Sequence, residues 1–527
     1  MDLDIREIAE EDGIGIARRN GIDRAFARSV RKHEHRAALT FGNRTWTYGR
    51  LFLAAGSVAA RLEELGIERG DRVAAYARNS DAYVILWLAC ARGGFVHVPI
   101  NYALTPPELD YIVTQSRAAA LVYDVDLAPT VDAAGALPVR VRGRFAGGGE
   151  ALDILDAAER GNAYDPRESP AASDLVQLLY TSGTTAAPKG AMMTHGALLA
   201  EYESCIIEAD HRDSDRVLAA LPLYHSAQMH CFMMPDLLLG ASTTLVQAFD
   251  PATCLRLIES ERITSFFAPP TAWIALLRHP DFATRDLTSL RKIYYGASIM
   301  PVPVLQELRT RLPGVAPYNL YGQSEIGPLA TVLRPEEHDA RPASAGRPVF
   351  NVETRIVDSE MKDVGPGVSG ELVHRSPQLM VGYWDKPEAT AEAFEGGWFH
   401  SGDVGWHDAE GYITITDRIK DVINTGGVVV SSREVEDVLF KHPAVSEAAV
   451  VSLPHPKWVE AVAAIVVLRP GAHVDETTLI DYARGELAPF KVPKRIFFSA
   501  SIPRNTAGKV LKRVLRDEYA NALNDAS

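Results

Sequence analysis

The 527-residue sequence has few cysteines, and its four, Cys90, Cys205, Cys231 and Cys254, show neither close pairing nor metal-ligand spacing. This argues against a disulfide framework and against a cysteine-based metal site. We expect four buried free thiols in a reducing compartment. No internal repeat and no long low-complexity segment is present either, which disfavours repeat architectures and extended disorder.

Long hydrophobic runs and a basic excess are also missing. No apolar run approaches the roughly 18 residues that span a bilayer, and residues 1–4 include two aspartates instead of the basic start of a signal peptide. The chain carries 54 Lys and Arg against 68 Asp and Glu, a net charge of −14. This balance disfavours a nucleic-acid partner, although a local basic cleft can still attract an anionic substrate. We expect a cytoplasmic protein without a membrane span.

Short apolar strands alternate with amphipathic helices along most of the chain, which predicts an α/β fold. An early unit is typical of the pattern. Leu51, Val58 and Leu62 recur at helical spacing, Gly66 is placed to end that helix, and residues 73–76 follow as a strand. The glycines of residues 143–149 follow no strand and open no helix, so we expect a loop there.

A domain boundary is predicted near residues 417–421. A strand-like alternation over residues 412–416 precedes it, and a new, smaller α/β pattern follows it. That pattern predicts helices at 432–441, 476–487 and 511–520 and strands at 448–452 and 461–468. The sequence therefore predicts a large N-terminal domain, residues 1–418, with several β-sheets flanked by helices, and a small α/β C-terminal domain, residues 419–527.

The strongest local motif is residues 180–190, YTSGTTAAPKG, which follows an apolar run predicted to be a strand. Hydroxyls and glycines let backbone N–H and side-chain O–H groups converge on phosphate oxygens, and Lys189 adds a positive charge. The spacing differs from the Walker pattern. A flexible surface turn is the alternative, and the density of hydroxyls disfavours it. The candidate phosphate ligands are Thr181, Ser182, Gly183, Thr184, Thr185 and Lys189.

This loop resembles the phosphate-binding loop of the adenylate-forming superfamily, which includes acyl-CoA synthetases, peptide-synthetase adenylation domains and beetle luciferase. Other motifs of that superfamily follow in order from about Thr47 to Lys512, so the resemblance covers nearly the whole chain. Several motifs in the right order are more specific than any one alone. The resemblance is nearest to acyl-CoA synthetases.

Two of these motifs imply an ATP site. Residues 319–325, NLYGQSE, resemble the adenine and magnesium motif, in which Asn319 and Tyr321 face the adenine, Ser324 contacts phosphate and Glu325 holds Mg²⁺. Many relatives have threonine at the position of Ser324, and a hydroxyl is kept here. Residues 397–403 resemble the ribose motif. The remaining ATP- and AMP-binding residues that the resemblance implies are Gly296, Ala297, Ser298, Gly322, Asp403 and Arg418.

Residues 221–225, LPLYH, resemble the motif that places a histidine beside the acid substrate. The resemblance implies that His225 shifts between two half-reactions and that Tyr224, His225, Met229 and Gly296 line the acyl pocket. The pocket segments that the resemblance implies, residues 226–234 and 295–298, are mostly apolar and show no arginine for a second carboxylate. They favour a hydrophobic monoacid, whether fatty, aromatic or polycyclic, and plain core packing of the methionines is the alternative interpretation.

Residues 503–509 resemble the last motif, which implies that Lys509 is a catalytic lysine that neutralises charge on the carboxylate and the α-phosphate. Lys420 matches the position of a hinge about which the small domain rotates between adenylation and thioester formation. Gly426 and Gly427 would then approach CoA, and Lys491 would attract its phosphates. On charge pattern alone, residues 417–421 fit a solvated turn. Ser432 stands where the family commonly has proline, and serine can replace it at a helix start.

The resemblance implies ATP-dependent activation of the acid to an acyl-adenylate, with Mg²⁺ as cofactor, followed by transfer to CoA. Three alternatives stay open: transfer to a carrier-protein thiol in trans, a luciferase-like oxygenase, and an enzyme of one half-reaction or a regulator without turnover. The partners expected are the acid, ATP and CoA. The oligomeric state is left open, with a homodimer as one candidate.

Overall fold

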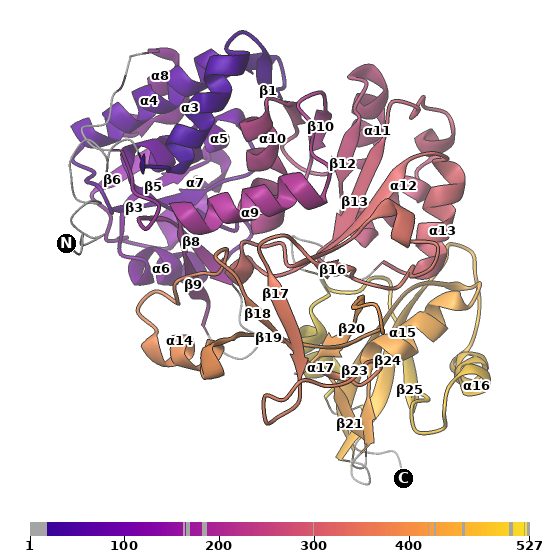
Figure 1. The fold of residues 1–527 in the computed structure, drawn as a ribbon. Helices are drawn as coiled ribbons and strands as arrows, with labels where there is room; N and C mark the ends of the chain where they lie inside the picture. Colours follow the sequence, from indigo (N-terminus) through magenta and orange to yellow (C-terminus); the bar gives the residue numbers. More distant parts are fainter. Residues whose placement is uncertain are drawn as a thin grey trace, which may run out of the picture.

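The computed structural model describes most of the chain. The described residues are 18–161, 164, 169–181, 187–298, 300–419, 421–425, 428–455, 459–504, 510–520 and 522–523. Figure 1 shows the N-terminal half, from indigo to magenta, above and to the left, and the last hundred residues, in orange and yellow, at the lower right. No helix among the described residues has the length and apolarity needed to cross a membrane.

A seven-stranded sheet forms the first layer, and all but its last pair of strands run parallel. Its order is β7 (Leu152–Asp153), β6 (Val141–Arg144), β5 (Ala118–Tyr123), β3 (Arg72–Tyr76), β4 (Val96–Ile100), β8 (Leu175–Thr181) and β9 (Lys189–Thr194). The helices between these strands are α5 (Asp81–Gly93), α6 (Pro106–Gln115), α7 (Ala128–Ala133) and α8 (Ile154–Glu159). Strand β5 is buried along its whole length, as expected for a parallel sheet covered on both faces.

A nine-stranded sheet forms the second layer. Its order is β16 (Arg347–Pro348), β15 (Thr331–Leu333), β14 (Ala316–Tyr321), β13 (Lys292–Gly296), β12 (Ser265–Phe267), β10 (Arg216–Ala219), β11 (Ser242–Leu245), β1 (Ala37–Phe41) and β2 (Arg44–Thr47). Its helices are α3 (Ile22–His33), α4 (Tyr48–Glu64), α10 (Met234–Leu239), α11 (Pro251–Ser260), α12 (Pro270–Arg278) and α13 (Val302–Arg311). Strands β10, β12, β13 and β14 run parallel, so their carboxyl ends meet at one edge.

Helix α9 (His195–Glu208) follows β9 and crosses the front of the molecule in Figure 1. The Thr194 side chain caps it by accepting a hydrogen bond from the backbone N–H of Ala197. A π-helical segment, η2 (Ala227–Met233), packs against α9 and leads directly into α10. The segment η2 carries Met229 and α9 carries Glu201, and both residues are described below.

Two smaller sheets complete the molecule. An antiparallel sheet has the order β17 (Glu353–Val357), β18 (Gly370–Arg375), β19 (Phe399–His407) and β20 (Ile413–Arg418), with α14 (Pro387–Ala393) beside it. The last sheet contains β22 (Val428–Val430), β21 (Ile423–Thr425), β24 (Val459–Leu468), β23 (Val445–His455) and β25 (Arg495–Phe498). Its helices are α15 (Ser432–Lys441), α16 (Glu476–Glu486) and α17 (Lys512–Tyr519). The last sheet and its helices have hydrophobic clusters of their own.

The expectation of a mixed α/β fold with a large first part and a small last part is confirmed. Helix α15 has the bounds predicted for it, and α16 ends one residue earlier than predicted. The loop expected at residues 143–149 is wrong at its start, because Gly143 and Arg144 belong to β6. A Cβ at Gly143 would lie 3.0 Å from the Cβ of Leu152 on the neighbouring strand, so the glycine permits close strand pairing.

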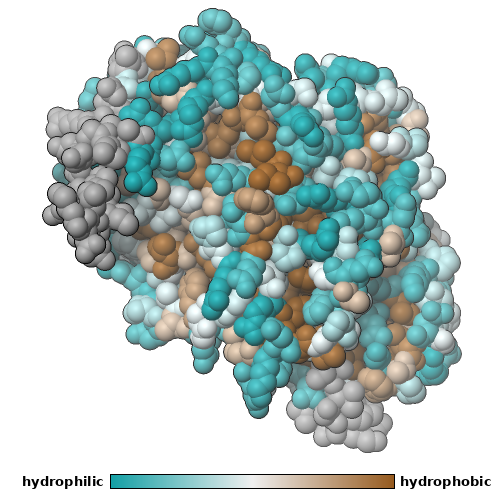
Figure 2. Space-filling model, in the orientation of Figure 1, coloured by the Kyte–Doolittle hydropathy of each residue, from teal (hydrophilic) through white to brown (hydrophobic). Residues whose placement is uncertain are grey.

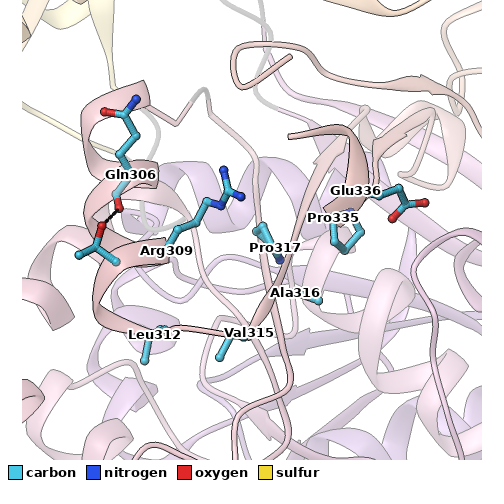
Figure 3. Close-up of a pocket in the computed structure, with 10 residues that line it drawn as sticks. Gln306, Arg309, Leu312, Val315, Ala316, Pro317, Pro335 and Glu336 are labelled. Carbon is cyan, nitrogen blue, oxygen red and sulfur yellow. Dashed lines mark hydrogen bonds between the residues drawn. The ribbon is translucent and has the colours of Figure 1, made fainter. Parts of the chain in front are cut away.

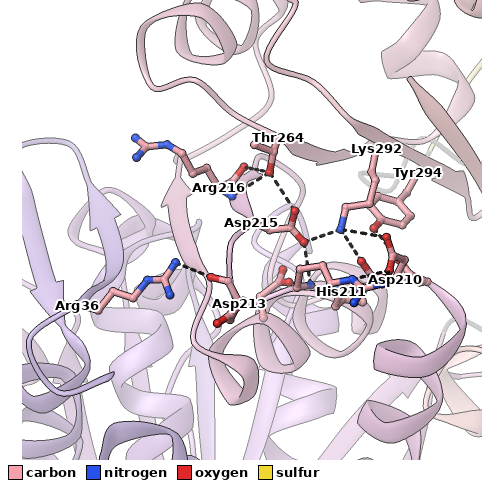
Figure 4. A network of polar contacts seen from close by, with 12 residues as sticks. Arg36, Asp210, His211, Asp213, Asp215, Arg216, Thr264, Lys292 and Tyr294 are labelled. Carbon is pink, nitrogen blue, oxygen red and sulfur yellow. Dashed lines mark hydrogen bonds and ion pairs between the residues drawn. The ribbon is translucent and has the colours of Figure 1, made fainter. Parts of the chain in front are cut away.

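A buried ion pair fixes the amino ends of β10 and β13. The Lys292 ammonium lies 2.5 Å from a carboxylate oxygen of Asp215 and donates to the carbonyl oxygen of Asp210, as Figure 4 shows. His211, beside them, lies 2.7 Å from Asp236. This network lies at the sheet edge opposite the carboxyl ends of the strands, and it contains no predicted site residue.

The four cysteines are buried free thiols, as predicted. The face in Figure 2 is mostly hydrophilic, with patches of hydrophobic residues near the middle of the view.

Candidate functional site

The described parts of the phosphate loop are residue 181 and residues 187–190, and its two flanks, Thr181 and Lys189, are register partners across β8 and β9. Ser182, Gly183, Thr184 and Thr185 lie outside the described residues. The Lys189 ammonium lies 5.0 Å from the ring centroid of Tyr383, over the aromatic face. The loop therefore leaves and re-enters the first sheet at one point, with a cation on its second flank.

The carboxylate of Glu325 lies against the first flank of this loop. Its Oε1 accepts hydrogen bonds from Thr181 Oγ1 and from the Tyr383 hydroxyl, each at 3.1 Å. The side chain lies on the short helical turn η4 (Ser324–Ile326), and the residue is 9% exposed. Among the described residues, no cation forms an ion pair with Glu325. A nearly buried carboxylate that has only neutral hydrogen-bond donors suits a hard cation with oxygen ligands, so the donor set fits Mg²⁺.

Tyr383 is a site residue that the sequence analysis missed. Burial, and then the nearby charge of Glu325, raises the pKa of its hydroxyl, which stays a donor to Glu325 at neutral pH. The backbone of residues 381–384 pairs with β9, which carries Tyr383 to the loop. No periodicity in the sequence indicates this pairing, because the two segments lie far apart along the chain.

Ser324 begins the turn of residues 324–329, called the nucleotide turn below, and connects it to the segment after His225. The hydroxyls of Ser324 and Ser226 lie 2.9 Å apart. Ser226 directly follows His225, a half-buried residue whose pKa is lowered to about 4 by desolvation, so its imidazole is neutral at pH 7. The rings of Tyr224 and His225 lie 4.4 Å apart. The predicted phosphate and acid residues are therefore neighbours.

The other predicted acyl-pocket residues are buried at the same sheet edge. Met229 lies on η2, and the Tyr224 ring meets the ring of Tyr102 edge-on at 5.7 Å. Gly296 ends β13, where a Cβ would lie 2.3 Å from the carbonyl oxygen of Leu320 on β14. Gly296 is thus required by strand spacing, whether or not a ligand lies beside it. Ala297, next to it, has a φ of +62°.

Asp403 is the centre of the predicted ribose site. Its carboxylate accepts hydrogen bonds from the Tyr321 hydroxyl at 2.8 Å and from Gln323 Nε2 at 2.7 Å, and it lies 3.0 Å from Arg418 Nε. Asp403 and Arg418 are register partners across β19 and β20. The amide of Asn319 donates to the carbonyl oxygen of Ser344. Gln323, inside the predicted adenine motif, is a contact that the sequence analysis did not assign.

Glycine at position 322 also has a packing reason. A Cβ there would lie 1.8 Å from the carbonyl oxygen of Pro328. Ser298 lies two residues beyond the end of β13, and no described contact assigns it a role.

A contact network crosses the predicted domain boundary. The backbone N–H and the hydroxyl of Ser432, the first residue of α15, both donate to Asp417 Oδ2 at 2.7 Å. The Lys512 ammonium donates to Ser432 Oγ and lies 2.9 Å from Glu436. Burial raises the pKa of Asp417. These contacts hold the start of α15 against the end of β20.

Several predicted C-terminal residues lie outside the described part of the chain, namely Lys420, Gly426, Gly427 and Lys509. Lys491 is described, and its ammonium lies 2.6 Å from the carboxylate of Glu434 on α15. This ion pair gives Lys491 a structural partner, and its predicted contact with CoA stays a prediction.

Two surface hollows lie away from these residues. One, of about 660 Å³, is bordered by Arg309 of α13 and by Glu336, as Figure 3 shows. It adjoins Ala316, where β14 begins, roughly 16 Å from Tyr321 at the other end of the strand. The other, of about 1060 Å³, lies between α3 and α9. Ligands of open α/β sheets bind at the carboxyl ends of strands, which disfavours the first hollow as the nucleotide site.

Comparison with protein families gives two matches along the chain. Residues 26–384 match the family described as AMP-binding enzyme, and residues 434–509 match the AMP-binding enzyme C-terminal domain. A feruloyl-CoA synthase of Amycolatopsis sp is 37% identical over 507 residues, which cover 95% of this chain and 100% of the relative.

Solved structures match over similar lengths. ATP-bound MatB from Rhodopseudomonas palustris is 32% identical, with a TM-score of 0.88 over 96% of this chain and 100% of that chain. Apo MatB from the same organism gives a TM-score of 0.76 over the same shares. The anthranilate CoA ligase AuaEII with anthranoyl-AMP is 27% identical, with a TM-score of 0.89 over 96% of this chain and 98% of that chain. The described arrangement is nearer to the ATP-bound form of MatB than to its apo form.

Proposed function

The chain belongs to the AMP-binding enzyme family as an acid–thiol ligase, and we propose that it joins a hydrophobic carboxylic acid to CoA in two half-reactions. In the first, the acid carboxylate attacks the α-phosphorus of ATP, which forms an acyl-adenylate and releases pyrophosphate. In the second, the CoA thiol attacks the acyl carbonyl, which forms acyl-CoA and releases AMP.

The observation that carries the proposal is the meeting of three motifs at Glu325 and Ser324. Thr181 brings the phosphate loop to Glu325, and Ser226 brings the segment after His225 to Ser324. A triphosphate held by the loop and an acid held beside His225 would therefore lie next to each other. Such proximity contributes much of the rate in reactions that need an in-line attack.

The proposed roles follow from the chemistry of each group. Glu325 and Thr181 offer oxygen ligands to Mg²⁺, which would neutralise charge on the phosphates when bound. Lys189 would add a positive charge at the loop. Asp403 would accept hydrogen bonds from the ribose hydroxyls, and Arg418 holds its carboxylate in place.

The acid side is proposed from the neutral state of His225 and from the apolar lining around it. A neutral imidazole at pH 7 can donate one hydrogen bond and accept another, and it does not form an ion pair with the carboxylate of the acid. Met229 and Tyr224 offer apolar contact. A feruloyl-CoA synthase among the relatives, and a long-chain-fatty-acid–CoA ligase of Mycobacterium tuberculosis at 34% identity, support an aromatic or a fatty acid as the substrate class.

We also propose that residues 419–527 form a mobile domain that turns about Lys420. The different TM-scores against ATP-bound and apo MatB, 0.88 and 0.76, are expected if members of the family change the arrangement of their parts. In the described arrangement, Asp417 and Ser432 join the two sides. Lys509 would act at the α-phosphate in the first half-reaction and leave with the domain before the second.

A cytoplasmic location is proposed because both ATP and CoA are consumed. A homodimer stays a prediction, and light scattering on the purified chain measures it.

Pyrophosphate exchange across a panel of acids tests the proposal. We expect ATP–pyrophosphate exchange with cinnamic acids or fatty acids and none with malonate, since the four predicted acyl-pocket residues, Tyr224, His225, Met229 and Gly296, include no lysine or arginine for a second carboxylate. Product masses with CoA as the sole thiol separate CoA from a carrier protein as acceptor. Exchange without any thioester in the presence of CoA would contradict the assignment of the acceptor.

A further inference from the structure

A buried carboxyl behind the nucleotide turn has no role in the reaction proposed above. Glu201 lies on α9 and is fully buried. Its Oε1 accepts hydrogen bonds from the backbone N–H of Leu329 at 3.0 Å and from the thiols of Cys205 at 3.2 Å and Cys231 at 3.6 Å. Its Oε2 accepts from Gln378 Nε2 at 2.6 Å. One side chain thus joins four segments: α9, η2, the turn after Glu325 and the segment before Tyr383.

Gln378 extends these contacts. It is fully buried, and its Nε2 also donates to the carbonyl oxygens of Leu329 at 2.9 Å and Ile326 at 3.1 Å. Its Oε1 accepts from the hydroxyl of Ser204, on α9, at 2.6 Å. Because the Gln378 amide has two N–H groups for three acceptors, the carbonyl oxygens of Leu329 and Ile326 and the carboxyl of Glu201 share them, while Glu201 accepts the N–H of Leu329. Loss of both would leave three buried backbone groups without these partners, which is costly.

This turn carries the groups assigned to phosphate and Mg²⁺. Ser324 and Glu325 immediately precede Ile326, and the backbone N–H of Met380, two residues after Gln378, donates to the carbonyl oxygen of Glu325 at 2.8 Å. The turn is also packed closely on α9, because a Cβ at Gly327 would lie 3.1 Å from the Cβ of Glu201. A shift of Glu201 or Gln378 therefore moves the backbone that aims Glu325.

The same carboxyl and thiols invite comparison with a metal site, since one atom from each of Glu201, Cys205 and Cys231 lies within 4.8 Å of the others. The contacts argue against a metal ion. Oε1 of Glu201 already accepts the N–H of Leu329, and burial raises the pKa values of both thiols, which disfavours thiolates. Burial also raises the pKa of Glu201 to about 8, which favours a neutral hydrogen-bonded group.

We propose that Glu201 and Gln378 are positioning residues, which hold the turn of residues 324–329 in the geometry that lets Glu325 bind Mg²⁺ with ATP. Through Cys231 the same contacts tie the turn to η2, two residues beyond Met229, so the nucleotide and acid sides keep one relative position. The inference rests on the proposed function for the assignment of Glu325, and it adds a second layer of residues that acts through Glu325.

Calorimetric titration of the full chain with ATP, with and without Mg²⁺, tests the inference apart from turnover. Glu201→Leu removes all four contacts of the carboxyl, and Glu201→Gln keeps the shape and an acceptor oxygen. Gln378→Leu leaves Glu201 in place and removes the amide contacts, which provides a milder version of the same test. Glu203→Leu is the matched control, because Glu203 is an exposed carboxylate on the same helix.

The quantity to follow is the ratio of the dissociation constant of ATP without Mg²⁺ to that with Mg²⁺. We expect this ratio to fall about tenfold or more in Glu201→Leu and Gln378→Leu, because outer residues that orient a metal ligand typically change metal affinity 10- to 100-fold. We expect Glu201→Gln to stay within about threefold of the wild type and Glu203→Leu to be unchanged.

A ratio unchanged in both leucine variants, with only their melting temperatures lowered, would overturn the inference and leave a purely structural role. The two claims fail separately. If the wild type binds ATP with Mg²⁺ and the ratio depends on Glu201, yet no acid supports pyrophosphate exchange, the proposed function fails while the positioning role stands.

Discussion

Substitution of proline for Ser432 is expected to change the balance between the two half-reactions. Ser432 makes two hydrogen bonds to Asp417, one from its N–H and one from its hydroxyl, and proline can make neither. Proline is well tolerated at the first position of a helix. Ser431 already has the extended backbone that a following proline requires, with φ of −73° and ψ of 123°. The variant therefore removes the contact with little damage to α15.

The magnitude follows from the two hydrogen bonds. Each hydrogen bond to a charged group contributes about 1.5–3 kcal/mol when buried. Asp417 is partly exposed, so we take about 1–3 kcal/mol for both together, which corresponds to a 5- to 150-fold change in the population of the described arrangement. If Lys420 is the hinge, rotation separates Asp417 from Ser432, so loss of these two hydrogen bonds destabilises only the described arrangement. The contact of Lys512 with Ser432 lies within the C-terminal part and is lost in both arrangements.

Two assays separate the half-reactions: pyrophosphate exchange, and thioester formation from supplied acyl-adenylate. We expect the ratio of the thioester rate to the exchange rate to rise about 5- to 150-fold in Ser432→Pro. Ser432→Ala keeps the N–H bond and should give a smaller rise. An unchanged ratio, or an equal loss of both rates with a lower melting temperature, would refute the reasoning that these contacts oppose domain rotation.

Three further results are expected. Glu325→Gln should lower the exchange rate about 100-fold or more, and excess Mg²⁺ should restore little of it, because the charge that attracts the cation is gone; a normal rate would show that Glu325 is not a ligand. Asp403→Asn should raise the KM for ATP about 5- to 150-fold, since its contact with Arg418 and its proposed contact with the ribose weaken together; an unchanged KM would contradict the ribose assignment. The free energy of unfolding should fall as pH rises from about 4.5 to about 8, because burial raises the folded-state pKa of Glu201 to about 8 and the folded state holds the proton more tightly than the unfolded state. Glu201 should contribute up to about 1.4 kcal/mol per pH unit to this fall. Urea denaturation of the wild type and of Glu201→Gln at pH 6, 7 and 8 measures that slope, and identical slopes would contradict it.

Local sequence signals predicted the elements well. The helix at 432–441 follows from a serine start and an apolar stripe, and the strand at 73–76 follows from a short apolar run after a glycine. Motif order also predicted which segments meet, since Thr181 contacts Glu325 across 144 positions of sequence.

Other contacts could not be predicted because tertiary packing alone creates them. Tyr383 reaches Glu325 only after residues 381–384 pair with β9, and Gln378 reaches Glu201 across 177 positions. Neither residue belongs to a motif with recognisable chemistry. The sequence predicts a loop at Gly143 because the glycines of residues 143–149 follow no recognisable strand and open no helix, whereas Gly143 lies in β6 and admits Leu152 of the next strand.

The central claim is that this chain adenylates a hydrophobic acid and then transfers the acyl group to CoA. The most direct measurement is ATP–pyrophosphate exchange with a panel of cinnamic, fatty and dicarboxylic acids, with product masses recorded with and without CoA, for the wild type and for Lys509→Ala. We predict exchange with a hydrophobic monoacid and an acyl-CoA product only when CoA is present. In Lys509→Ala we predict that the exchange rate falls by at least about 100-fold. Absence of exchange with every acid, together with no conversion of supplied acyl-adenylate to acyl-CoA, would contradict the account.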